Sequence, residues 1–243
     1  MSENSLLSSK SIPSRERLIL ALDLPSADEA RALVEGLGES VCFYKLGLQL
    51  NMAGGYFELV SWLRERGKKV FVDLKFFDVP ATVKNAVAQL VGRGANFTTV
   101  HGNDGVLEAA ASVDRGELKI LAVTVLTSLD RGDLDDLGFS CDVEQLVLSR
   151  ARRALEHGCD GVISSGLEAP RLRAQLGEKL LIVTPGIRPV ENRPVDDQKR
   201  VVTVVDAFRG GADYIVVGRP IRNADDPRRA AEVIQKQIAS VFA

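Results

Sequence analysis

The stretch KKVFVDLKFFDVPATVKNAV, residues 68–87, places three charged side chains within and just after a strongly apolar run. In a β-strand, side chains two residues apart lie on the same face, so Asp73 and Lys75 share one face. The alternating residues are apolar and face the other way: Val70, Val72, Leu74 and Phe76. Charges in such a setting are rarely tolerated without partners. Asp73, Lys75 and Asp78 therefore belong either to a structural ion-pair network or to a functional site.

The same succession of an apolar run and a helical pattern recurs along the whole chain. Runs typical of β-strands occupy eight segments: 17–23, 41–47, 69–75, 96–102, 119–126, 160–166, 181–187 and 213–219. Between them, apolar residues recur at spacings of three and four, most clearly in 27–38, 56–67, 80–94 and 142–158. The sequences RGAN, HGCD and GGAD each supply a glycine of the kind that closes a helix before the next strand.

Eight strands alternating with helices in 243 residues predict a fold of the α/β class, a single (β/α)8 TIM barrel. The competing fold, an open doubly wound sheet, usually carries G-x-G-x-x-G after its first strand, and LALDLPSADEA at 20–30 contains no glycine. We expect the barrel to span residues 17–243 as one catalytic domain. Residues 1–16 are polar, and we expect them to form a flexible tail.

The composition argues against several classes of partner. The formal net charge is −2, which offers no long-range attraction to nucleic acid or to an anionic membrane surface. No apolar run approaches the roughly 20 residues that cross a bilayer, and the N-terminus lacks the pattern of a secretory signal. The three cysteines show no CxxC spacing, which favours a reducing compartment over a disulfide framework or a zinc site. We therefore expect a cytoplasmic protein.

Polar side chains gather where the predicted strands end. In a barrel, the carboxyl ends of all strands meet on one face, where active sites are built. The residues that end a strand or follow it closely there are Asp23, Lys45, Asp73, Lys75, Asp78, Thr127, Ser128, Arg188, Gln198, Gly218 and Arg219. His101 also ends a strand and could line such a site. The long connections 127–142 and 188–200 lie on the same face.

The charges on this face suggest a substrate. Lys45, Asp73, Lys75 and Asp78 alternate in sign and sum to zero, which lowers the cost of placing them in a partly desolvated mouth. A salt-bridge network that joins the second and third strands is the structural alternative. GRP at 218–220 could offer backbone N–H groups and a guanidinium to a phosphate. Together these features predict a small phosphorylated substrate.

Six ordered motifs carry a resemblance to a known family. They are ALD (21–23), YKLG (44–47), DLKFFDVPATV (73–83), VTVLTS (123–128), TPGIRP (184–189) with DQKR (197–200), and YIVVGRP (214–220). Together they resemble orotidine 5'-phosphate decarboxylase, most strongly its bacterial form, from about residue 17 to the C-terminus. The chain departs from the family in HGNDG after the fourth strand and in its polar N-terminal tail.

The resemblance implies a role for each matched residue. Lys75 would donate a proton to C6 of the pyrimidine, flanked by Asp73 and Asp78, with Lys45 completing the charge array. Asp78 and Thr82 would reach the partner's site across a homodimer interface. The substrate would be held by the remaining residues, with Asp23 and Lys45 on the ribose, Thr127 and Ser128 near the base, and Gln198, Gly218, Arg219 and Arg188 at the phosphate.

The chemistry explains why such residues are needed. Loss of CO2 from C6 leaves an electron pair in the plane of the ring, out of conjugation with its carbonyl groups. Enzymes often pass carbanions to a cofactor, but the resemblance implies none. A fixed ammonium beside C6 could stabilise the developing charge and then protonate the carbon. The resemblance therefore implies a carboxy-lyase that forms UMP, with no cofactor and no metal.

Two other functions remain open at this point. A sugar-phosphate decarboxylase or aldolase of the same superfamily shares D-x-K-x-x-D but works through Mg²⁺, and it would need a further acidic ligand where this chain has Lys45. A non-catalytic nucleotide-binding barrel is the second alternative, against which the intact set of charges argues.

Overall fold

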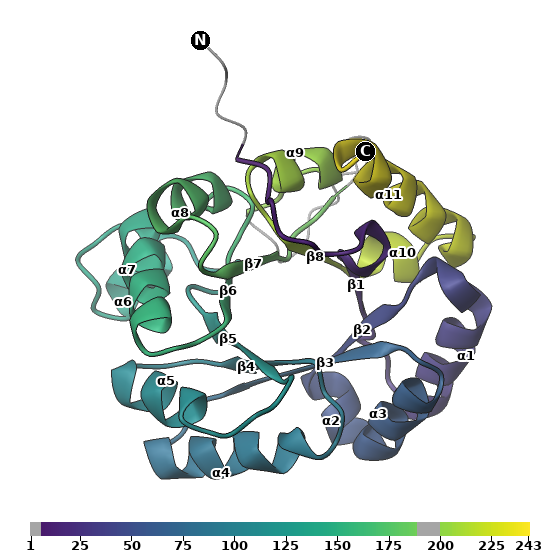
Figure 1. The fold of residues 1–243 in the computed structure, drawn as a ribbon, viewed down its shortest axis with the longest axis horizontal. Helices are drawn as coiled ribbons and strands as arrows, with labels where there is room; N and C mark the ends of the chain where they lie inside the picture. Colours follow the sequence, from purple (N-terminus) through teal and green to yellow (C-terminus); the bar gives the residue numbers. More distant parts are fainter. Residues whose placement is uncertain (1–5, 189–199) are drawn as a thin grey trace.

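The chain folds into a closed barrel of eight parallel strands in the order β1 to β8, surrounded by a ring of helices (Figure 1). The computed structural model describes residues 6–188 and 200–243. Each strand pairs with the next in sequence, and β1 closes the barrel by pairing with β8. The predicted (β/α)8 barrel is confirmed.

All eight predicted strands are present. Most of them end a few residues earlier than predicted, where the polar loop begins. The strands are β1 Leu18–Ala21, β2 Phe43–Leu46, β3 Lys69–Phe76, β4 Phe97–Val100, β5 Lys119–Val123, β6 Gly161–Ile163, β7 Leu181–Thr184 and β8 Tyr214–Val217. Ile187 and Val202 form one further isolated bridge after β7. The longest strand, β3, is the one that carries Asp73 and Lys75.

The helices that pack around the barrel include the four that the sequence predicts most clearly. They are α1 Ala27–Leu37, α2 Leu48–Ala53, α3 Tyr56–Glu65, α4 Pro80–Val91, α5 Asp104–Ala111, α6 Arg131–Asp136, α7 Val143–Glu156, α8 Ala169–Leu176, α9 Val204–Arg209, α10 Arg219–Arg222 and α11 Pro227–Val241. Two short 3-10 helices, η1 Ser14–Glu16 and η2 Gly38–Ser40, precede β1 and β2. One glycine from each of RGAN, HGCD and GGAD adopts positive φ after α4, α7 and α9, as predicted; they are Gly94, Gly158 and Gly211.

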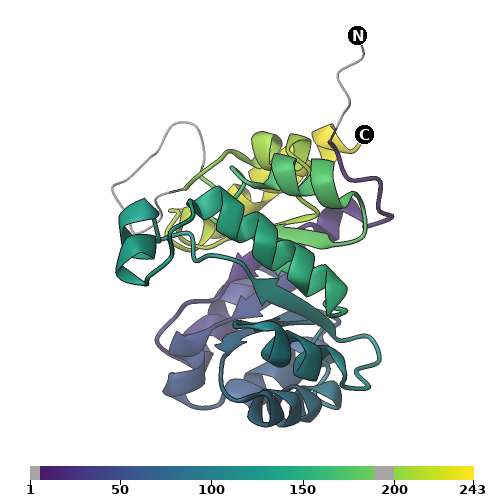
Figure 2. The same ribbon diagram turned by 90° about the vertical axis from the view of Figure 1, so that its left-hand side faces the viewer.

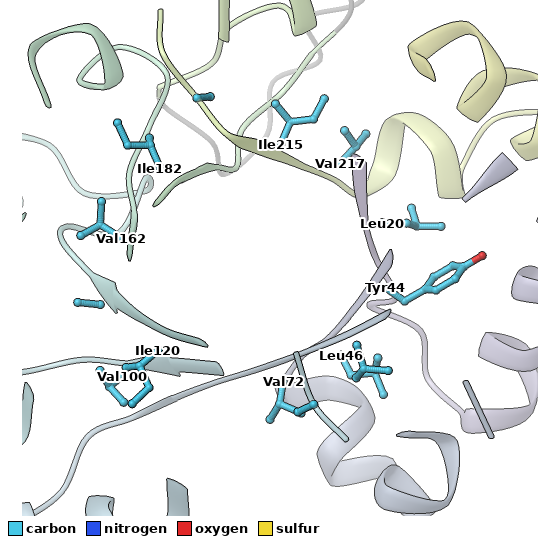
Figure 3. Packing of buried hydrophobic residues seen from close by; sticks show 14 of the residues in the cluster. Leu20, Tyr44, Leu46, Val72, Val100, Ile120, Val162, Ile182, Ile215 and Val217 are labelled. Atoms are coloured by element: carbon cyan, nitrogen blue, oxygen red, sulfur yellow. The ribbon is translucent and has the colours of Figure 1, made fainter. Parts of the chain in front are cut away.

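Two apolar cores follow from the alternation of side chains along the strands. One set faces outward and packs against the helices, as shown by Leu20, Tyr44 and Val72 in Figure 3. The other set fills the inside of the barrel, where Phe43, Phe97 and Tyr214 meet edge to face. These aromatic rings occupy the interior near the amino ends of the strands, and the opposite mouth is the one where barrels of this kind carry their active sites.

The N-terminal segment lies across the closed end of the barrel. Ile12 packs on the inner core, and Ser8 and Lys10 bond the carboxylate of Asp213, which is fully buried and also accepts from Arg173. Figure 2 shows this segment on the side of the barrel opposite α6. The boundary between tail and barrel at residue 17 stays a prediction, and these contacts hold residues 6–16 against the barrel.

No helix within the described residues is long and apolar enough to cross a membrane.

Candidate active site

A pocket of about 440 Å³ opens at the carboxyl ends of the strands, a size that suits a small organic ligand. Nine residues predicted from the sequence line it: Asp23, Lys45, Asp73, Lys75, Thr127, Ser128, Arg188, Gly218 and Arg219. Five basic and two acidic side chains face this space, in a chain whose formal net charge is −2. The pocket is therefore locally positive and suited to an anion.

A chain of alternating charges runs along one wall. Lys45 Nζ lies 3.4 Å from Asp23 Oδ1 and 3.1 Å from Asp73 Oδ2. Lys75 Nζ donates to the other oxygen of Asp73 at 2.9 Å. Gly47 makes room for this array, because a Cβ at that position would lie 3.3 Å from both Asp23 Oδ1 and Lys45 Nζ. Asp73 thus holds both lysines, one on each oxygen.

The backbone at Lys75 has an unusual conformation that aims its side chain. Lys75 has φ +49°, and no other non-glycine residue in the described part of the chain has positive φ. The register between β3 and β4 shifts between Val72 and Phe76, so a bulge lies at this position. Lys75 N–H donates to Thr99 Oγ1 at 2.9 Å, and Thr99 donates to Asp73 Oδ1 at 2.8 Å.

The pKa shifts of Asp73 and Lys45 favour the charged form of each group. Burial alone would raise the pKa of Asp73, but Lys45, Lys75 and the hydroxyl of Thr99 outweigh it and lower the pKa to about 2. For Lys45, burial alone would lower the pKa, but Asp73 and Asp23 outweigh it and the net shift is upward. Asp73 is therefore ionised and Lys45 charged at any pH near neutrality.

The depressed pKa of Asp73 predicts a pH dependence of stability. Because its folded pKa lies below its ordinary value of 3.8, ionised Asp73 contributes about 2 kcal/mol above about pH 4. That contribution is lost as the pH falls from about 4 towards 2. Between those values, the unfolding free energy of the wild type should fall more steeply than that of Asp73→Asn, measured by urea titration. Parallel pH profiles would contradict this assignment.

The wall of the pocket formed after β7 and β8 is basic. Arg188, Arg219 and Arg222 line it, beside Gly186 and Gly218. The side chain of Arg188 is almost fully buried and donates to the carbonyl of Ile187 at 2.9 Å. Arg222 donates to the carbonyl of Asp23, which joins this wall to the charge chain. Because β7 lies four strands from β3 in the closed barrel, a phosphate near Arg188 would lie across the pocket from Lys75.

Three predicted residues are not among those that line the pocket. Asp78 and Thr82 are exposed at the start of α4, and Asp78 accepts from the backbone N–H of Val79 at 2.6 Å. The described chain therefore brings together three members of the predicted neutral array, with Asp78 outside. Gln198 lies outside the described residues.

His101 does not line the pocket. Its ring lies 5.4 Å from that of Phe77 in an edge-to-face contact. Burial, with Arg150 and Lys75 adding to it, lowers the pKa of His101.

Sequence reasoning missed three residues that shape the site. Thr99 shares a strand face with the inward Phe97, so alternation along β4 could have identified it. Arg222 lies three residues after Arg219, so the helical spacing along α10 could have identified it. Arg200 pairs with buried Glu168 and donates to the carbonyls of Val125 and Leu126, just before Thr127. No local sequence pattern predicts this tertiary contact.

Within residues 6–188 and 200–243, no group of three or more His, Cys, Asp and Glu side chains is arranged to hold a metal ion.

Comparison with known proteins decides the family. Residues 16–234 match the model of the orotidine 5'-phosphate decarboxylase / HUMPS family. Over 239 residues, the chain is 66% identical to an orotidine 5'-phosphate decarboxylase from Methylococcus capsulatus, with 98% of each chain covered. The chain belongs to the orotidine 5'-phosphate decarboxylase / HUMPS family. The family that the sequence motifs predicted is confirmed.

More distant family members agree in sequence and in fold. A relative from Nitrobacter winogradskyi with the same decarboxylase name is 50% identical over 229 residues, which cover 94% of this chain and 95% of that one. The crystal structure of orotidine 5'-phosphate decarboxylase from Lactobacillus acidophilus has a TM-score of 0.80 at 35% identity, and 92% of this chain and 99% of that chain are covered. The crystal structure of orotidine 5'-phosphate decarboxylase from Pyrococcus horikoshii has a TM-score of 0.72 at 27% identity, and 91% of this chain and 99% of that chain are covered.

Proposed function

We propose that the chain is an orotidine 5'-phosphate decarboxylase, a carboxy-lyase that converts orotidine 5'-phosphate to UMP and CO2. The observation that carries this proposal is the Lys75 ammonium, fixed on Asp73 at 2.9 Å in the pocket, across from a wall of arginines. A relative named for this activity and 66% identical over nearly the full length supports it.

Lys75 is the proposed acid of the reaction. When the bond between C6 and the carboxylate breaks, its electron pair stays on C6 and CO2 departs. The ammonium of Lys75 stabilises that pair electrostatically and then transfers a proton from Nζ to C6, which forms UMP. Water returns a proton to the amine. Asp73 holds the ammonium of Lys75 in place before the reaction. The charges around C6 therefore need not rearrange as negative charge develops on that carbon.

Lys45 distinguishes this site from a magnesium site. The magnesium-dependent relatives considered from the sequence would need a further acidic ligand at the end of the second strand. Here the ammonium of Lys45 lies between Asp23 and Asp73, within 3.4 Å of a carboxylate oxygen of each. A divalent cation in the same place would meet a positive charge. We assign Asp23 and Lys45 instead to the ribose hydroxyls.

The remaining residues bind the two ends of the nucleotide. Thr127 and Ser128 line the pocket at the end of β5, where their hydroxyl groups can bond the edge of the base. Gly218, Arg219 and Arg188 form the proposed phosphate site, together with Gln198 from the resemblance. Binding energy gained at the phosphate, remote from the reacting carbon, can be used to position the pyrimidine against Lys75.

Arg219→Ala should lower the affinity for UMP about 100-fold, because a charge-assisted contact to phosphate contributes roughly 3 kcal/mol. The affinity for uridine, which lacks the phosphate, should stay the same. Isothermal titration with both ligands measures the two effects. Arg209→Ala, which removes an exposed arginine on α9, is the matched control. An unchanged affinity for UMP would rule out the phosphate assignment of Arg219.

We also propose a homodimer in which Asp78 and Thr82 complete the partner's site. Both lie outside the chain's own pocket, on an exposed segment that begins α4. Phe77 and Val79 flank Asp78 and are 68% and 62% exposed. Large apolar side chains exposed together are typical of a surface that another protein covers.

The expected location is the cytoplasm. All three cysteines carry free thiols, and burial raises the pKa of Cys159 to about 12. Free thiols are typical of proteins in a reducing compartment. Fractionation of the native cells, followed by detection of the protein, tests this location.

The proposed function is tested by incubating the purified protein with orotidine 5'-phosphate. Ultraviolet absorbance should fall as UMP forms, with one CO2 released for each UMP. A sugar phosphate in place of the nucleotide should give no turnover. If only the sugar phosphate reacts, the magnesium-dependent alternative is correct. If neither reacts and the nucleotide merely binds, the chain is a nucleotide-binding barrel.

A further inference from the structure

The hydroxyl of Thr99 closes a ring of three hydrogen bonds around Lys75. It accepts from the backbone N–H of Lys75 at 2.9 Å and donates to Asp73 Oδ1 at 2.8 Å. The same oxygen of Asp73 accepts from Lys75 Nζ at 2.9 Å. One hydroxyl therefore connects the backbone of the lysine to the carboxylate that holds its ammonium.

This ring lies where the backbone departs from regular strand geometry. Lys75 has φ +49°, a left-handed conformation that is costly for a residue with a Cβ. The shift of register between β3 and β4 at the same place removes the regular ladder partner of the Lys75 N–H. Thr99 Oγ1 supplies an acceptor to that N–H. The hydroxyl thus stabilises the local conformation that points Lys75 into the pocket.

Thr99 itself is fully buried and does not line the pocket. It can therefore influence the reaction through Lys75 and Asp73, without touching the substrate. We infer that Thr99 is a positioning residue, which sets the place of the Lys75 ammonium relative to C6. This inference rests on the proposed decarboxylation.

The neighbouring residue supplies a matched control. Thr98 is also fully buried on β4, but its side chain faces the opposite side of the strand. Its Oγ1 has no hydrogen-bond partner. Replacing either threonine with valine removes one hydroxyl and conserves the volume. Comparing the two variants therefore separates the loss of the Thr99 hydrogen bonds from the general effect of replacing a buried threonine on β4.

The test compares Thr99→Val, Thr99→Ser and Thr98→Val by steady-state kinetics with orotidine 5'-phosphate. Thr99→Val should lower kcat about 10- to 100-fold, because a displacement of about 1 Å can cost that much, and should change KM less than threefold. Thr99→Ser keeps the hydroxyl and should stay within threefold of the wild-type kcat. Thr98→Val should stay within twofold. The affinity for UMP should be the same in all four proteins.

The outcomes are distinct. An unchanged kcat in Thr99→Val, or an equal loss in Thr98→Val, would overturn the positioning role. A rise in KM with no fall in kcat would also overturn it, since it would indicate a binding role. If Thr99→Val does not fold, Thr99→Ala, which removes the hydroxyl without added bulk, carries the same comparison. A wild-type protein without decarboxylase activity would instead refute the proposed function.

Discussion

Lys75→Ala should lower kcat by about 10⁵-fold, the largest effect of any single substitution in this protein. The ammonium has two proposed tasks, electrostatic stabilisation of the C6 carbanion and protonation of that carbon. Each task separately contributes on the order of 10²- to 10⁴-fold in enzymes of known mechanism. With the ammonium gone, no other group of the described pocket is assigned either task.

The fold should survive this change, because the side chain of Lys75 is 35% exposed at the mouth and leaves the apolar cores intact. Stopped assays over long incubations measure the residual rate, and circular dichroism checks the fold. Lys236→Ala, at an exposed position on α11, should keep the wild-type rate. A folded Lys75→Ala protein with full activity would refute the role of Lys75.

Asp78→Ala should lower kcat about 10²- to 10³-fold, although Asp78 does not line the pocket of its own chain. The reason is the proposed dimer, in which each site takes Lys75 from one chain and Asp78 from the other. Equal amounts of Lys75→Ala and Asp78→Ala chains, unfolded and refolded together, should then recover about a quarter of the wild-type activity. Half of the dimers are mixed, and each has one intact site.

A matched control shows whether recovered activity comes from sites shared between two chains or from refolding two variants together. Lys75 and Asp73 of one chain bond each other, so both belong to the same site. Lys75→Ala chains refolded with Asp73→Ala chains should recover no activity. If the mixture with Asp78→Ala recovers none either, Asp78 does not complete the partner's site.

The fold could be predicted from the sequence because each strand repeats one local signal. An apolar run, a polar residue at its carboxyl end and a glycine after the next helix recur through the chain, and a barrel is the closure that fits eight such units. The alternation in β3 also placed Asp73 and Lys75 on one face, opposite Val70 and Val72. The structure confirms this arrangement, with Val70 and Val72 in the outer core.

What the sequence could not supply depends on contacts between distant segments. Thr99 lies 24 residues from Lys75, and their hydrogen bond exists only because β3 and β4 are neighbours at a bulge. The bonds of Lys10 to Asp213, 203 residues away, have no sequence signal either, because a polar tail usually indicates flexibility. The proposed contribution of Asp78 to a partner's site would depend on two chains, so neither the sequence nor the structure of one chain can display it.

The most direct test of the central claim is the decarboxylation rate of the purified protein in excess EDTA. If the ammonium of Lys75, held by Asp73, is the group that stabilises the carbanion, kcat and KM for orotidine 5'-phosphate will be the same with and without the chelator. A loss of activity in EDTA that Mg²⁺ restores would contradict the account, because the charge facing C6 would then belong to a metal ion.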